Sequence, residues 1–157
     1  MFGSELITTS VKNPKQDGPA IVPFITAGYP DKDSFLDLLT ALAKTADVIE
    51  IGVPFSDPMA DGVTIQRSSH AAIESGVTLK WILEQLKTLK IKTPIVLMSY
   101  LNPLYVYGYD QLVKASLEAG VDGFIIPDLP VEEGEEIREA LSQAELAMIQ
   151  LVTPATP

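Results

Sequence analysis

Three carboxylates, Glu50, Asp57 and Asp61, lie close together in the sequence and could carry out proton-transfer chemistry. Glu50 falls inside the apolar run VIEIG, which has the composition of a strand, and the two aspartates follow in a loop rich in proline and glycine. Because successive side chains of a strand point to opposite faces, Glu50 faces away from its neighbours Ile49 and Ile51. Burial raises the pKa of a carboxyl group, and such a group can act as a general acid and base. The pattern therefore predicts an acid–base site around Glu50.

A structural role for the same residues stays open. A buried glutamate can also be held by a neighbouring backbone group or a lysine. Aspartate beside proline and glycine is an ordinary turn residue, so Asp57 or Asp61 taken alone is better explained as part of a turn. The chemical interpretation rests on their shared loop, which follows an inward-facing glutamate directly and can fold an acid over a bound ligand.

Short apolar runs alternate with stretches of helical periodicity along the chain. Strands are expected at residues 20–26, 47–52, 94–100, 123–126 and 147–152. Helices are expected at residues 31–46, 64–76, 79–90, 109–120 and 131–144. The segment LNPLYVYG, residues 101–108, is expected to be a loop.

This alternation predicts an α/β fold with a parallel sheet, either an open doubly wound sheet or a (β/α)8 barrel. No G-x-G-x-x-G motif follows a strand, which weakens the dinucleotide-binding form of the open sheet. Polar residues gather just after the strands, where the mouth of a barrel lies, at Asp57, Asp61, Asn102 and Asp128. We therefore expect a TIM barrel, here incomplete because only five of its strands are present, formed by residues 1–157 as a single domain.

Composition excludes several classes of partner and site. The chain of 157 residues has a net charge of −10, a single histidine and no cysteine. An acidic surface repels phosphate backbones and anionic lipid, so neither nucleic acid nor a membrane is an expected partner. Without a cluster of histidine or cysteine there is no indication of a metal site. No signal peptide or spanning segment is apparent, and a cytoplasmic location is expected.

Several motifs resemble the tryptophan synthase alpha chain. They are PFITAGYP, EIGVPFSDPMADG with TIQ after it, LMSYLNP, GVDGFIIPDLPVEE and LVTPATP, in family-like order from about Pro23 onward. The family is a carbon–carbon lyase of tryptophan biosynthesis that cleaves indole-3-glycerol phosphate to indole and glyceraldehyde 3-phosphate in a retro-aldol reaction. The resemblance implies that Glu50 is the general acid–base. It also implies that Asp61 bonds the indole N–H and stabilises the positive charge that develops there.

The resemblance implies further roles for residues of the strands and loops. Those expected to line the indole pocket are Phe24, Met98, Tyr100, Ile125, Pro127 and Val152. Those expected to face the beta chain are Pro54, Asp57, Asn102 and Pro103. The implied assembly contains two alpha and two beta chains, in which pyridoxal phosphate belongs to the beta chain and this chain holds no cofactor.

Alternatives to this interpretation remain. The family's glycine-rich phosphate site lies in a second half of the barrel, and no substitute phosphate loop is found here, so residues 1–157 are expected to be inactive alone. The chain could instead be a non-catalytic half barrel that docks on a beta chain. It could also be another phosphate-sugar barrel, such as an isomerase, although the motif around Glu50 and Asp61 argues against that.

Overall fold

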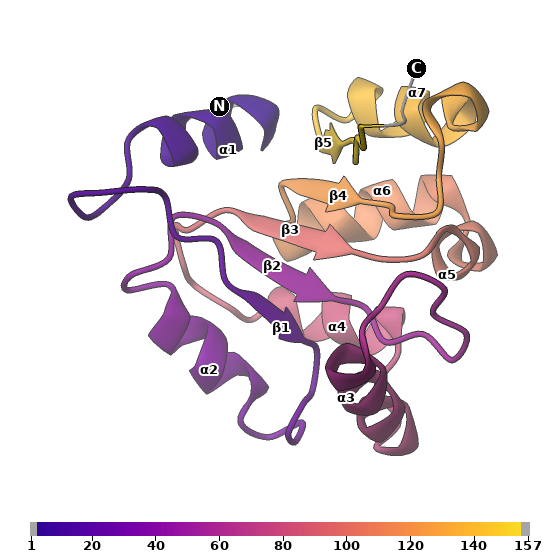
Figure 1. The fold of residues 1–157 in the computed structure, drawn as a ribbon, viewed down its shortest axis with the longest axis horizontal. Coiled ribbons are helices and arrows are strands. Elements are labelled where there is room, and N and C mark those ends of the chain that lie inside the picture. The colour runs from indigo at the N-terminus through magenta and orange to yellow at the C-terminus, as the bar shows by residue number, and fades with distance from the viewer. Residues whose placement is uncertain (1–2, 155–157) are drawn as a thin grey trace.

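One parallel sheet organises the molecule in the computed structural model, which describes residues 3–154 (Figure 1). The strands lie side by side in chain order, and each pairs in parallel with the next. The prediction of five parallel strands is confirmed, although each is shorter than expected. They are β1 (Phe24–Thr26), β2 (Ile49–Gly52), β3 (Ile95–Met98), β4 (Gly123–Ile125) and β5 (Ala147–Ile149).

Helices connect the strands, as parallel pairing requires. No helix within residues 3–154 is long and apolar enough to cross a lipid bilayer. The expectation of a loop at residues 101–108 is wrong, because most of this segment forms a helix. The helices are α1 (Gly3–Lys12), α2 (Phe35–Leu42), α3 (Val63–Glu74), α4 (Leu79–Leu86), α5 (Leu101–Tyr107), α6 (Tyr109–Ala119), the 3-10 turn η1 (Val131–Glu133) and α7 (Glu135–Gln143).

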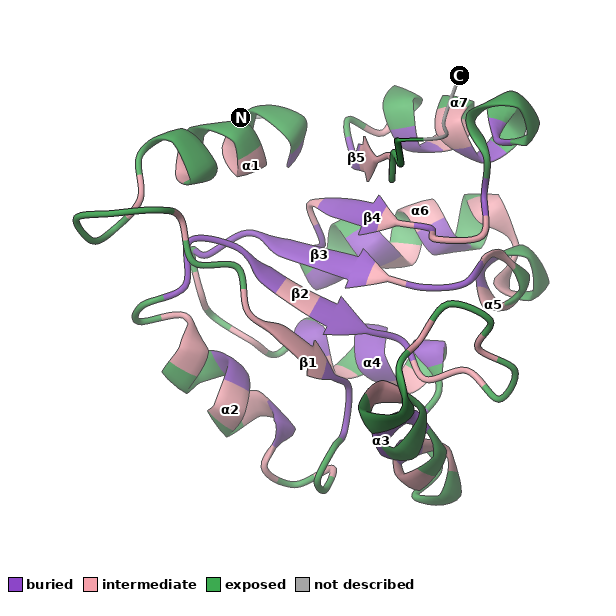
Figure 2. Cartoon of the chain, viewed as in Figure 1, coloured by how far each residue is buried: buried purple, intermediate pink, exposed green. Residues whose placement is uncertain are grey.

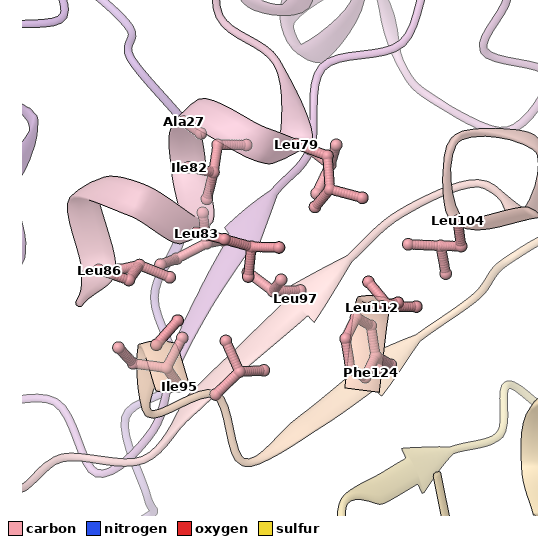
Figure 3. Packing of buried hydrophobic residues seen from close by; sticks show 14 of the residues in the cluster. Ala27, Leu79, Ile82, Leu83, Leu86, Ile95, Leu97, Leu104, Leu112 and Phe124 are labelled. Carbon is pink, nitrogen blue, oxygen red and sulfur yellow. The ribbon is translucent and has the colours of Figure 1, made fainter. Parts of the chain in front are cut away.

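The hydrophobic core lies between the sheet and the helices. In Figure 1, α4 and α6 lie behind the sheet, and Figure 3 shows apolar side chains of α4 directed toward those of β3. Burial is greatest on the central strands and falls at the edge strands β1 and β5 (Figure 2). Every second residue of β2, β3 and β4 belongs to this core and is almost fully buried, namely Ile49, Ile51, Ile95, Leu97 and Phe124.

The opposite face of the sheet, which we call the inner face, looks toward the viewer in Figure 1, and no described helix crosses it there. The strand register places Phe24, Glu50 and Val96 in one row across this face, because they are directly paired. Glu50 alternates with Ile49 and Ile51 of the core, so it points to the inner face as expected.

A cluster of hydrogen bonds ties the chain together at the amino ends of the strands. The carboxylate of Asp47, just before β2, accepts the backbone N–H groups of Lys15 at 2.7 Å and Ile21 at 2.8 Å. The ammonium group of Lys15 donates to two carbonyl oxygens and to the hydroxyl of Thr93 at 2.7 Å. These bonds lower the pKa of Asp47, first through the Ile21 N–H and then through the Lys15 N–H.

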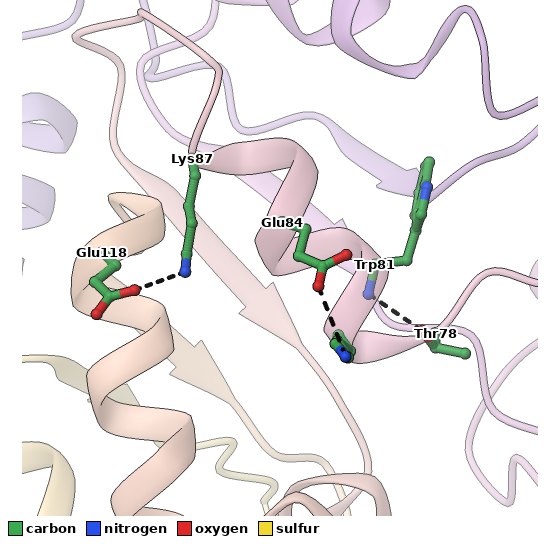
Figure 4. A network of polar contacts seen from close by, with 6 residues as sticks. Thr78, Trp81, Glu84, Lys87 and Glu118 are labelled. Carbon is green, nitrogen blue, oxygen red and sulfur yellow. Dashed lines mark hydrogen bonds and ion pairs between the residues drawn. The ribbon is translucent and has the colours of Figure 1, made fainter.

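Polar contacts also link the outer helices (Figure 4). The hydroxyl of Thr78 accepts the N–H of Trp81 at 3.1 Å and so caps the start of α4. Lys87, at the end of α4, bonds Glu118 of α6 at 2.6 Å. Both members of this pair are exposed, so they contribute little to the position of α4, which is set mainly by its buried apolar face.

Candidate active site

Glu50 stands in the middle of β2 with its side chain on the inner face. It is half-buried between Phe24 of β1 and Val96 of β3, its partners in the sheet. Burial raises the pKa of its carboxyl group above the usual glutamate range. Within residues 3–154, no hydrogen bond or ion pair holds this carboxylate. The alternative of a glutamate fixed by a backbone group or a lysine is therefore not what the structure shows.

Asp61 is half-buried near the end of the loop that follows β2, residues 53–62. The loop leads into α3, whose N-cap is Gly62. From the first turn of α3, the side-chain amide of Gln66 donates a hydrogen bond to the backbone carbonyl of Asp61 at 2.8 Å. The backbone of Asp61 is thus held by the helix, while its carboxylate accepts a hydrogen bond from the hydroxyl of Tyr100.

Tyr100 lies two residues after β3, at the N-cap of α5, and only 4% of its surface is exposed. Its hydroxyl accepts the backbone N–H of Ala60 at 2.9 Å, and its ring packs against Phe55 with the ring centroids 5.3 Å apart. Burial raises the pKa of Tyr100, and the N–H of Ala60 partly offsets this. The charge of Asp61 and its hydrogen bond with the hydroxyl raise the pKa further, as does the charge of Asp128. Tyr100 therefore contacts the loop that carries Asp61 rather than lying apart from it.

A small hollow brings together four of the predicted site residues from separate elements, Phe24, Asp61, Met98 and Tyr100. The ring of Phe24 lies across Gly52, where a β-carbon would come within 2.5 Å of it. The hollow measures about 10 Å³, which is room for about one water molecule. It is therefore too small for an indole ring, and a ligand of that size would lie over it on the inner face.

The remaining residues predicted to bind substrate do not line this hollow. Ile125, on the inner face of β4, and Pro127, just after that strand, are both half-buried. Val152 is 73% exposed and lies beyond the end of β5, which stops at Ile149 rather than continuing to residue 152.

The residues predicted to face a partner chain lie in two connections that follow neighbouring strands, the loop after β2 and the helix α5 after β3. Asp57 and Asn102 are exposed, and Pro54 and Pro103 are half-buried. The Asp57 carboxylate accepts a hydrogen bond from the hydroxyl of Ser56. Both connections lie at the carboxyl ends of the strands, the same end as Asp61.

Asp128 has a role that its position after a strand did not reveal. Its carboxylate accepts the backbone N–H of Leu101 at 2.9 Å, and this bond caps α5 from the turn that follows β4. A polar residue directly after β4 was the only signal available in the sequence. Within the described part of the chain, no group of three or more histidine, aspartate or glutamate side chains is placed to hold a metal ion.

Comparison with known proteins decides the family. The family model for the tryptophan synthase alpha chain matches residues 11–157. The chain belongs to the tryptophan synthase alpha chain family. It is 49% identical over 141 residues to the alpha chain of Nitratidesulfovibrio vulgaris strain Hildenborough. This alignment covers 88% of this chain and 55% of the relative. It is 46% identical over 156 residues to the alpha chain of Geotalea uraniireducens, which covers 98% of this chain and 58% of that one.

Solved structures agree with this assignment. The alpha subunit of tryptophan synthase from Legionella pneumophila matches with a TM-score of 0.90 at 34% identity, over 100% of this chain and 61% of that one. The tryptophan synthase complex from Pyrococcus furiosus matches with a TM-score of 0.83 at 41% identity, over 88% of this chain and 58% of that one. The sheet is therefore part of a TIM barrel, as expected, and the chain spans a little over half the length of the alpha chains that it matches.

Proposed function

We propose that this chain supplies the acid–base part of an alpha-type active site, which cleaves indole-3-glycerol phosphate to indole and glyceraldehyde 3-phosphate. The observation that carries the proposal is Glu50, a half-buried carboxyl group on the inner face with a raised pKa and no structural partner within the described residues. A carboxyl group whose pKa burial raises can both accept and return a proton during a reaction.

In this proposal Glu50 moves protons between carbon 3 of the indole ring and a hydroxyl of the glycerol chain. Protonation of that carbon makes the ring electron-poor, and the carbon–carbon bond to the glycerol chain can then break. Asp61 bonds the indole N–H, where the positive charge develops, and so favours the transition state over the bound substrate. Phe24, Met98 and Tyr100, around the hollow, form one wall for the ring, and Ile125 and Pro127 extend it.

The grip on the substrate's phosphate group is assigned to the part of the barrel that corresponds to the second half of the relatives. The binding energy of a remote group positions the reacting end of a substrate. This explains our expectation that residues 1–157 do not catalyse the reaction alone.

The partner we propose is a tryptophan synthase beta chain. A solved relative from Pyrococcus furiosus is described as an α2β2 complex, which supports an assembly of two alpha and two beta chains. Exposed Asp57 and Asn102, with Pro54 and Pro103 beside them, offer a contact surface at the carboxyl ends of the strands. Pyridoxal phosphate would belong to the beta chain, and this chain would need no cofactor of its own. A cytoplasmic location belongs to the same proposal.

The test uses a chimera in which residues 1–157 are joined to the C-terminal remainder of the Nitratidesulfovibrio vulgaris alpha chain. We expect the parent chimera to release indole from indole-3-glycerol phosphate. The Glu50→Gln variant should lower kcat by about 10²–10⁴-fold, because the amide keeps the shape of the side chain but cannot carry the proton. The matched control is Glu84→Gln on the exposed face of α4, which should keep the parent rate.

A folded chimera that releases no indole would overturn the proposal, as would a Glu50→Gln variant within tenfold of the parent rate. Substrate binding should change little in Glu50→Gln, so titration with a non-reactive indole compound provides a check that the site is intact.

A further inference from the structure

We propose that Tyr100 and Gln66 are positioning residues that hold Asp61 at the inner face, and that Tyr100 does this in addition to forming part of the substrate wall. The inference rests on the proposed function for the role of Asp61 in catalysis. We call the contacts of Tyr100 and Gln66 with the loop of residues 53–62 the clamp. The clamp rests on the geometry of the loop alone.

Tyr100 contacts the loop of residues 53–62 near both of its ends. Near the start of the loop, the ring of Phe55 packs against the Tyr100 ring with a centroid separation of 5.3 Å. Near its end, the N–H of Ala60, one residue before Asp61, donates to the Tyr100 hydroxyl at 2.9 Å. Because only 4% of Tyr100 is exposed, water does not compete freely for either contact.

Gln66 holds the other side of the same short segment. Its side-chain amide donates to the Asp61 carbonyl at 2.8 Å from the first turn of α3. The two bonds fix the backbone N–H just before Asp61 and the backbone C=O of Asp61 itself. Neither of these two bonds uses the Asp61 carboxylate, which interacts directly with the Tyr100 hydroxyl as a hydrogen-bond acceptor and lines the hollow beside it.

The rest of the loop shows why a clamp is needed. Ser56, Asp57 and Met59 are exposed, and Met59 is 79% exposed, so little packing orders the middle of the loop. A carboxylate that stabilises developing charge is effective only when it is already in place before the reaction. A displacement of about 1 Å at such a group can lower a rate by roughly 10²-fold.

The Tyr100→Phe variant tests the clamp, because it removes the hydroxyl and keeps the ring that packs on Phe55. In the 157-residue chain, amide hydrogen exchange measured by NMR should speed up at Ala60 by at least roughly tenfold, since that N–H loses its acceptor. The matched control is Tyr105→Phe, which removes a hydroxyl from a residue that is 67% exposed on α5. Exchange at Ala60 should not change in this control.

The Gln66→Met variant provides an independent second arm. It removes the amide donor from an exposed position and keeps a side chain of similar length that suits a helix. In the chimera described above, Tyr100→Phe and Gln66→Met should each lower kcat by roughly 10–100-fold, with KM within threefold of the parent. A role confined to general stability would lower the Tm without this separation of kcat from KM.

The Glu50→Gln chimera, measured in parallel, separates the two ideas. If Glu50→Gln abolishes turnover while Tyr100→Phe and Gln66→Met leave kcat unchanged, the positioning role is wrong and the proposed function stands. If Ala60 exchange is unchanged in Tyr100→Phe, the clamp is wrong whatever the activities are. If exchange rises but Glu50→Gln turns over normally, the clamp exists but does not serve the proposed reaction, and the inference fails with the proposed function.

Discussion

The two faces of the sheet differ in how far their side chains are buried, even between neighbouring residues of one strand. On the helix side, Leu97 of β3 is fully buried in the core, and so is Ile51 of β2. On the inner face, the next residue Met98 is only half-buried, as is Glu50. Val96 of the inner face is only 1% exposed, so the difference is confined to some of its positions. The helix side is packed to hold the fold, and the inner face keeps incompletely packed groups at Glu50 and Met98 that can meet a ligand.

Two carboxylates in and just before β2 show the same difference. Asp47, at the amino end of the strand, accepts two backbone N–H groups, and these bonds lower its pKa. Glu50, in the middle of the strand on the inner face, has a pKa that burial raises. The two carboxylates, three positions apart, are therefore suited to different roles. Asp47 is hydrogen-bonded by the backbone and holds the fold, whereas Glu50 has no such bonds within residues 3–154 and can take part in proton transfer.

The largest expected effect comes from removing core volume on the helix side. Leu97→Ala should lower the free energy of unfolding by about 2–5 kcal/mol, because it leaves a cavity among well-packed apolar side chains. Met98→Ala, on the inner face of the same strand, should cost less than about 1.5 kcal/mol, because Met98 is already partly exposed. Urea denaturation of both variants measures the difference, and equal losses would contradict the division between the faces.

The next effect concerns Asp47. Asp47→Asn should lower the Tm by several degrees, because an amide cannot accept from both Lys15 and Ile21 and leaves one N–H without an acceptor. Exposed Asp33→Asn is the control and should keep the parent Tm.

The same variant has a pH signature. Because the folded-state pKa of Asp47 lies below its unfolded value, its contribution is present above the usual aspartate range and is lost as pH falls through the lowered pKa. Thermal melts at decreasing pH should therefore show the parent approaching Asp47→Asn. A constant difference between them would mean that the charge of Asp47 is not what stabilises the fold.

The smallest effect should have the opposite sign. The folded-state pKa of Glu50 lies above its unfolded value, so stability falls as pH rises from the usual glutamate range through the raised pKa. Glu50→Gln removes this loss and should stabilise the chain at pH 7, by less than about 1 kcal/mol because the group is partly exposed to solvent. Below about pH 4 the advantage should disappear. A destabilised Glu50→Gln at neutral pH would show that the carboxylate is a structural group after all.

Much of the fold could be predicted because its signals are local. The alternation of Ile49, Glu50 and Ile51 places the acid on one face and the apolar residues on the other, and the structure agrees. The five strands and most helices were likewise visible as apolar runs and helical periodicity. The strand ends were predicted too long, since apolar residues such as Leu151 and Val152 continue past the last ladder bond and lie exposed.

The features that were missed depend on contacts between distant segments. Helix α5 begins at Leu101, whose N–H is capped by Asp128 from the turn after β4. Pro103 is compatible with this helix because it lies in the first turn, where its missing N–H has no partner to lose. The bond from Ala60 to Tyr100 also spans forty positions of the chain. Such pairings follow from the folded arrangement and have no local pattern in the sequence.

The contacts of helix α1 determine how late in synthesis this helix can dock. The N–H of Gly3 donates to the carbonyl of Glu145 at 2.9 Å, and a β-carbon at Gly3 would come within 2.1 Å of the Asp122 carbonyl. The first turn of α1 thus packs closely against the backbone of residues 122 and 145, which come much later in the sequence. During synthesis from the amino end, α1 leaves the ribosome long before its binding surface exists. The bond from Gly3 to Glu145 can form only after residue 145 has been made, so α1 cannot complete its docking until the chain has been synthesised to just before β5.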